Sequence, residues 1–177
     1  MAEWLLISYH VPSHPSAVRV ATWRALKQIG AVALGDGLYA LPATAGHEDQ
    51  LLQVSARIAG GGGIAISFRA TTLTPEDENA VQQKFLAARH DEYLQVAKSA
   101  NKLVDHISRE EATEDYRFAE VESLEEELEK VRRQFDRVTA RDHLALPVRD
   151  QAESAIREAE SRLQEYFGHA YRRENQE

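Results

Sequence analysis

Two hydrophobic patterns divide the chain near residue 73. Before that point, short apolar runs alternate with amphipathic segments, and the breaks between them carry Gly, Pro or Ser. After it, apolar residues recur every three or four positions over long stretches, which is the helical period. The pattern predicts a mixed strand and helix domain over residues 1–73 and a helical domain over residues 74–177.

The first domain reads strand, helix, strand, strand, helix, strand. Gly35-Asp36-Gly37 is a hairpin signal, which makes Asp36 a turn former, and the glycines of 60–63 end the second helix. This βαββαβ order predicts an α+β domain of the ferredoxin-like type, an antiparallel sheet with both helices on one face. The expected strands are 4–11, 31–34, 38–42 and 64–73. The first expected helix is capped by Ser13 or Ser16 and runs to about Ile29, and the second spans residues 47–59.

The second domain reads as three long helices, the first of which begins at Thr74-Pro75-Glu76 with a capping threonine, a proline and an acid. Narrow apolar stripes predict an antiparallel, coiled-coil-like arrangement. The stripes pack either within one chain or against a second copy. Their members are Leu86, Tyr93, Ala97, Ala100, Val104 and Ile107, then Val121, Leu124, Leu128, Val131, Phe135 and Val138, then Val148, Ala152, Ala155, Ala159, Leu163 and Tyr166.

Charge is distributed unevenly between the two domains. The formal net charge is −8, yet residues 1–73 hold five basic and four acidic residues, and the remainder holds 16 basic and 25 acidic residues. An acidic chain has no general attraction for nucleic acid, so any DNA contact requires a local basic patch, which a dimer would double. The absence of cysteine and of a long apolar run predicts a cytoplasmic protein without thiol chemistry.

A helical wheel separates two sides of the first helix. Val18, Ala21, Thr22, Ala25, Leu26 and Ile29 fall on the side expected to face the sheet. Arg19, Trp23, Arg24 and Lys27 fall on or near the opposite side. An exposed tryptophan tends to mark a contact surface, so we expect this side to meet DNA or a protein partner. The alternative is that Trp23 packs beneath the helical domain.

The residues carry no pattern typical of an enzyme, a cofactor site or a metal site. His10 and His14 straddle Pro12, and no second histidine stands at ligand spacing from His143. The glycines of 60–63 precede a strand and lack the Lys-Ser/Thr pair of a phosphate loop. We expect Arg141 and Asp142 to tie the end of the second long helix to the neighbouring unit. The prediction is a non-enzymatic protein without a cofactor or a metal.

The N-terminal residues resemble the ChrB family of chromate-resistance regulators. The resemblance rests on Arg19, "WRALK" from Trp23 to Lys27, "GA" at residues 30–31 and "DGLYALP" from Asp36 to Pro42. It continues less sharply through "GGGGIAISFRA" and the helices. The first domain also resembles, more distantly, PaaX-type repressors and CRISPR spacer-acquisition nucleases. The nucleases place an acidic metal ligand at the end of the first strand, where this chain has Ser8-Tyr9-His10.

The resemblance implies a cytoplasmic transcriptional regulator with chromate as its signal. DNA contacts are then expected from Arg19, Trp23, Arg24 and Lys27, doubled in a homodimer. An oxyanion would require convergent cations, for which Arg19, Arg24 and Arg69 are candidates. Longer ChrB proteins carry a further C-terminal domain. The alternative function is therefore a non-enzymatic interaction or dimerisation module that lacks their sensor domain.

Overall fold

The computed structural model describes residues 2–14, 16–114, 116–142 and 146–174. Two compact units divide the chain, one ending at Ala88 and the other beginning at Arg89. None of the described helices combines the length and the apolarity that crossing a membrane requires. The elements are β1 (Glu3–His10), α1 (Ser16–Gln28), β2 (Val32–Gly35), β3 (Leu38–Pro42), α2 (Ala45–Gly60), β4 (Ile64–Thr71), α3 (Pro75–Ala112), α4 (Phe118–Thr139) and α5 (Val148–Glu174).

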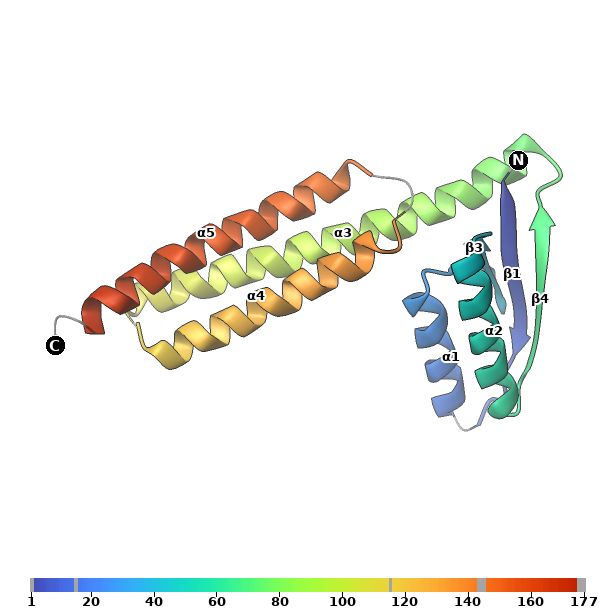
Figure 1. Ribbon diagram of the computed structural model, residues 1–177, viewed down its shortest axis with the longest axis horizontal. Coiled ribbons are helices and arrows are strands. Elements are labelled where there is room, and N and C mark those ends of the chain that lie inside the picture. Colours follow the sequence, from blue (N-terminus) through green and yellow to red (C-terminus); the bar gives the residue numbers. More distant parts are fainter. Residues whose placement is uncertain (1, 15, 115, 143–145, 175–177) are drawn as a thin grey trace. The chain divides into compact units, whose positions relative to one another are not determined.

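The first unit confirms the predicted α+β fold. Its four strands form one antiparallel sheet in the order β2-β3-β1-β4, which is the ferredoxin-like order. Helices α1 and α2 lie side by side over one face of this sheet (Figure 1). Their contact with the sheet buries an apolar core. It is made mainly of Leu5, Ile7, Leu26, Leu41, Leu51, Val54 and Ile58.

The turns of this unit form where the glycines predict them. Gly37 follows Asp36 at the hairpin tip with a φ of 69°, and a Cβ there would lie 2.6 Å from the backbone oxygen of Tyr9. Only glycine tolerates both conditions. Helix α2 begins after Thr44, whose hydroxyl accepts a hydrogen bond from the backbone N–H of His47, and it ends at the glycines of 60–63. These caps position α2 against β4.

The opposite face of the sheet is partly covered by the first turns of α3. Phe85 stacks on Trp4 with ring centroids 5.2 Å apart, and Val81 and Ala88 pack beside them. This contact explains why the boundary between the compact units falls within α3, later than the predicted boundary at residues 73 and 74. The predicted stripe is wrong at Leu86, because its neighbour Phe85 is the buried residue of this turn.

The second unit contains α4, α5 and the part of α3 after Ala88, which run alongside one another in alternating directions (Figure 1). Its core contains residues from all three helices, so the predicted stripes pack within one chain. Val104, Phe135 and Ala155 are only partly buried at its edge. Alanines with no exposed surface at positions 100, 152 and 159 allow close approach of the helix backbones.

Candidate nucleic-acid interface on α1

The buried side of α1 follows from its apolar spacing. Thr22, Ala25 and Leu26 are buried against the sheet, and Val18 and Ile29 are partly buried. Ala21, which the helical wheel places on this side, is exposed beside the groove between α1 and α2. Helix α1 therefore packs on the sheet through one narrow row of side chains, and most of its surface is exposed to solvent.

The outer side of α1 presents the four residues named from the sequence. Arg19, Trp23, Arg24 and Lys27 are all exposed, and the indole of Trp23 keeps 47% of its surface accessible. Arg19, Trp23 and Lys27 are spaced four residues apart, so they form one row along the helix. Arg24 stands next to that row. We call these four residues the α1 ridge.

The α1 ridge carries positive charge on a helix that has no acids of its own. Helix α1 contains three basic residues and no acidic residue. Within the described part of the chain, no ion pair engages Arg19 or Arg24. The charge of Arg19 nevertheless acts on Tyr9 and opposes the rise in the pKa of Tyr9 that burial and neighbouring Tyr39 cause. Arg19 and Arg24 are thus cations available to an anionic partner.

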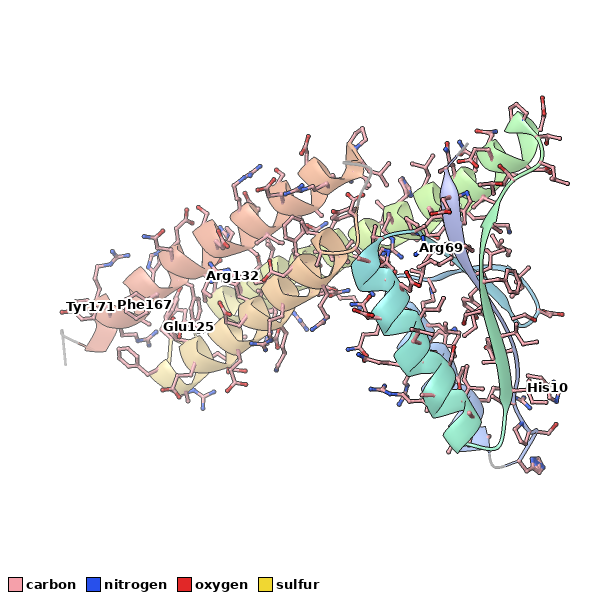
Figure 2. The ribbon with its side chains drawn as sticks, turned by 45° about the vertical axis from the view of Figure 1, so that its right-hand side comes forward. His10, Arg69, Glu125, Arg132, Phe167 and Tyr171 are labelled. Carbon is pink, nitrogen blue, oxygen red and sulfur yellow. The ribbon has the colours of Figure 1, made fainter. Side chains whose placement is uncertain are left out.

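Arg69 differs from the arginines of the ridge because carboxylates already hold it. Its guanidinium donates to Glu3 Oε2 at 2.8 Å and also to Glu48 Oε2, and these contacts raise the pKa of Arg69. It lies on β4 beside α2 (Figure 2), whereas Arg19 and Arg24 lie on α1. Among the described residues, the ion pairs of Arg69 are with these two glutamates. Of the three arginines considered for an oxyanion, Arg69 is therefore already paired with carboxylates.

A groove beside the ridge adds residues that sequence reasoning missed. Gln28 of α1 and Gln50, Gln53 and Arg57 of α2 line it, together with the apolar side chains at its floor. Arg57 is exposed, so α2 also presents a cation on the helical side of the sheet. Arg57 follows the buried Val54 by three residues, so helical spacing could have placed it beside the buried side of α2. The sequence could not show that α1 lies next to this part of α2, because that pairing is a tertiary contact.

Among the remaining sequence candidates, His14, Arg141 and Asp142 make local contacts. His14 hydrogen-bonds Ser13 through its ring Nδ1 at 2.9 Å, and His10 is exposed at the end of β1 (Figure 2). Arg141 contacts Glu92 at 3.2 Å, and Tyr93 donates to Asp142 Oδ2 at 2.9 Å. Both contacts tie the end of α4 to α3 within the helical unit, and not to the neighbouring unit as the sequence led us to expect, because Glu92 and Tyr93 belong to the part of α3 after Ala88. His143 lies outside the described residues.

Comparison with known proteins agrees with the family suggested by the α1 segment. A family model described as the N-terminal part of protein ChrB matches residues 19–177, a range that contains the whole α1 ridge and the helical unit. A relative named protein ChrB, from Cupriavidus metallidurans, is 29% identical over 92 residues. That alignment covers 52% of this chain and 28% of the relative. The chain belongs to the ChrB N-terminal family.

Proposed function

We propose that this protein is a non-enzymatic transcriptional regulator of chromate resistance that contacts DNA through the α1 ridge. The observation that carries the proposal is the acid-free helix α1, on which Arg19 and Arg24 are exposed and make no ion pair with the described residues. Family membership supports a regulatory role, because the resemblance to chromate-resistance regulators implies one.

The ridge matches the chemistry of a phosphate backbone. Arginine forms directed, charge-assisted hydrogen bonds to phosphate oxygens, and such contacts position a protein on DNA without reading its sequence. The exposed indole of Trp23 lies between Arg19 and Lys27 and supplies an apolar surface against a sugar or a base edge. Arg57 extends the cationic surface toward α2. A symmetric homodimer would present two such ridges.

Salt dependence follows from the charge distribution. The helical unit is strongly acidic, so it repels DNA at long range and leaves attraction to a few local contacts. Each phosphate contact releases a counterion, and affinity then falls steeply as salt increases. We expect tight binding only at low to moderate salt.

Fluorescence anisotropy with DNA from the neighbouring intergenic region tests the proposal. The double variant Arg24→Ala, Lys27→Ala should bind at least about tenfold more weakly and should show a salt slope that is shallower by roughly one for each phosphate that is no longer bound. The control is Lys98→Ala, Lys102→Ala, which removes the same charge from exposed positions of α3. Equal affinity of the two double variants would contradict the proposal. The same assay with chromate added to the complex of wild-type protein and DNA tests whether chromate changes the DNA affinity.

A second function, a dimerisation or interaction module, is favoured by a specific surface. Ile64, Ile66 and Phe68 alternate along the edge strand β4 and remain exposed, with 68% of the Ile64 surface accessible. Exposed apolar residues on a strand whose outer edge is unpaired are typical of a contact surface. This function predicts stable oligomers in light scattering and no DNA retention even at low salt. A monomer that binds the intergenic DNA would exclude it.

A further inference from the structure

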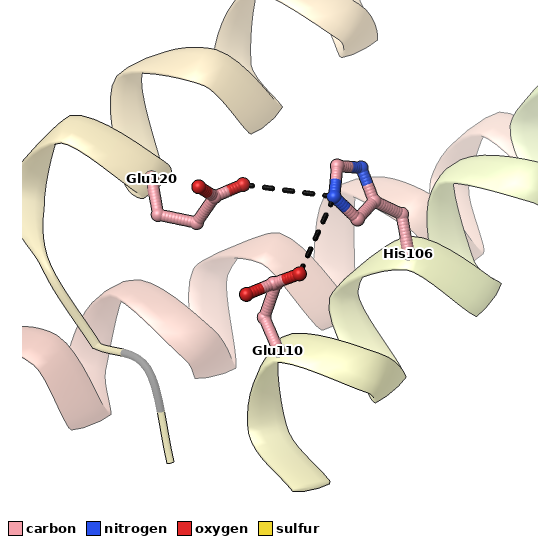
Figure 3. A group of neighbouring side chains, drawn as sticks. All are labelled: His106, Glu110 and Glu120. Carbon is pink, nitrogen blue, oxygen red and sulfur yellow. Dashed lines mark ion pairs between the residues drawn. The ribbon is translucent and has the colours of Figure 1, made fainter. Parts of the chain in front are cut away.

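Three side chains of the helical unit direct ligand atoms to one point. His106 and Glu110 stand one turn apart on α3, and Glu120 lies in the first turn of α4 (Figure 3). The imidazole Nε2 of His106 lies 3.5 Å from Glu110 Oε1 and 3.6 Å from Glu120 Oε1. One ligand atom from each residue lies within 4.8 Å of the other two. All three residues are half-buried.

These separations suit a bridging cation better than direct hydrogen bonds. A strong hydrogen bond between nitrogen and oxygen is shorter, at about 2.7–3.2 Å. In a tetrahedral zinc site with bonds of about 2.0–2.1 Å, neighbouring ligand atoms lie about 3.3–3.4 Å apart. The distances from Nε2 to the two carboxylates are close to that spacing. A cation between the three atoms therefore requires little change in the two distances from Nε2, while the carboxylate oxygens of Glu110 and Glu120 lie within 4.8 Å of each other.

A fourth residue orients the imidazole. Glu127, two turns after Glu120 on α4, places its carboxylate 3.4 Å from the other ring nitrogen, Nδ1 of His106. A carboxylate at Nδ1 favours the tautomer in which Nδ1 carries the proton and Nε2 keeps a free lone pair. Histidines that ligate metals in proteins are commonly oriented in this way. Glu127 therefore directs the lone pair of Nε2 toward Glu110 and Glu120.

The charge of the cluster also favours a cation. Three carboxylates surround a single imidazole, so the group keeps a negative charge whether the imidazole is neutral or protonated. Glu110 and Glu120 keep only 22% and 20% of their side-chain surface accessible, which limits screening by water. A divalent ion would offset this charge and would join α3 to α4 near the turn between them.

We propose that His106, Glu110 and Glu120 bind a divalent transition-metal ion, for which Zn²⁺ is the best-matched probe. One imidazole and two carboxylates are ligands that Zn²⁺ accepts, with solvent as the fourth ligand. Mg²⁺ and Ca²⁺ prefer all-oxygen sites and should bind more weakly. The site is independent of the α1 ridge and of the proposed DNA contact, because it uses only residues of the helical unit.

Isothermal titration of the tag-free full chain with ZnCl₂ tests the site. The wild-type protein should bind one Zn²⁺ tightly. Glu120→Gln should weaken that binding at least about tenfold, and Glu127→Gln should weaken it by about 10–100-fold because it removes the orienting carboxylate. The control is Glu125→Gln, which removes the same charge from an exposed position of α4 (Figure 2) and should change the affinity less than twofold.

Cobalt absorption provides a readout that does not depend on the carboxylate variants. Co²⁺ bound in a tetrahedral site with a nitrogen ligand gives intense visible bands, and Zn²⁺ should abolish them by displacement. His106→Asn should remove the bands while circular dichroism still reports a folded protein. Equal Zn²⁺ affinity of Glu120→Gln and Glu125→Gln, or wild-type protein without a tetrahedral Co²⁺ spectrum, would overturn the proposal.

Discussion

The indole Nε1 of Trp4 donates a hydrogen bond to Glu78 Oε2 at 3.2 Å, joining β1 to the first turns of α3. Thr72 Oγ1 donates to the same oxygen at 2.8 Å, and Gln82 and the backbone of Ala2 donate to Oε1. Among the described residues, the buried charged side chains are Glu78 and Arg89. Trp4 thus makes two contacts with α3, a hydrogen bond to Glu78 and a stacked ring contact with Phe85. Both contacts hold the start of α3 on the sheet.

Glu78 should make the stability of the first unit depend on pH. Hydrogen bonds from Thr72 and then from Trp4 stabilise the carboxylate and lower the pKa of Glu78. This contribution is present above the ordinary pKa of glutamate in the unfolded chain and is lost as the pH falls through the lower folded-state pKa. Glu78→Gln should be less stable at neutral pH and should lose less stability on acidification. Urea unfolding at several pH values measures both effects.

Glu76→Gln is the matched control for that measurement. Glu76 lies in the same first turn of α3 but is exposed. Its variant should keep the acid dependence of the wild-type protein. Identical pH profiles for Glu76→Gln and Glu78→Gln would show that the buried hydrogen bonds do not contribute as argued.

Phe85→Ala should destabilise the first unit by about 3–5 kcal/mol, the usual cost of removing a buried aromatic ring. Both tryptophans of the chain lie in this unit, at positions 4 and 23, so tryptophan fluorescence during denaturation reports on it. Leu86→Ala, at the half-exposed neighbouring position, should cost less than half as much. A larger loss of stability for Leu86→Ala than for Phe85→Ala would show that Leu86, and not Phe85, is the buried residue.

Tyr93→Phe should weaken the helical unit by about 0.5–1.5 kcal/mol, because the variant cannot form the hydrogen bond to Asp142 while its buried ring remains. Burial raises the pKa of Tyr93, so the folded state retains the neutral phenol. The wild-type protein should lose stability as the pH rises above the ordinary tyrosine pKa, and the variant should lose less. Chemical denaturation followed by circular dichroism measures this.

Arg69→Ala should leave DNA affinity within twofold of the wild-type value. Glu3 and Glu48 already neutralise this arginine, so its removal takes no available cation from the surface. Arg24→Ala, which removes an arginine with no ion pair to the described residues, should weaken binding in the same anisotropy assay. A stronger effect of Arg69→Ala than of Arg24→Ala would shift the anionic contact from α1 to β4.

Local signals accounted for most of the secondary structure. The glycines at 35, 37 and 60–63 and the threonine at 74 mark turns and caps whose conformations depend on one or two residues, and the elements begin and end near them. The outward side of α1 also followed from spacing, because a helix wheel requires only the helical period. The antiparallel sheet followed from the order of the elements.

Contacts between distant segments could not be obtained in the same way. Phe85 and Leu86 are adjacent apolar residues, and only the position of Trp4 on the sheet decides which of them is buried. Helical spacing could have paired His106 with Glu110, but Glu120 joins them only because α4 folds back against α3. Arg69 resembles Arg24 in the sequence, and only the tertiary structure places two glutamates beside it.

The amino-acid sequence by itself determined the helices, strands and turns, the charge asymmetry and the exposed face of α1, because each depends on residues close together along the chain. The tertiary structure decided that the helical stripes pack within one chain, which cations remain available and where His106, Glu110 and Glu120 meet. These features depend on which side chains meet across a distance in sequence. Which side chains meet is decided by the packing of the whole unit, not by the hydrophobic period of any one helix.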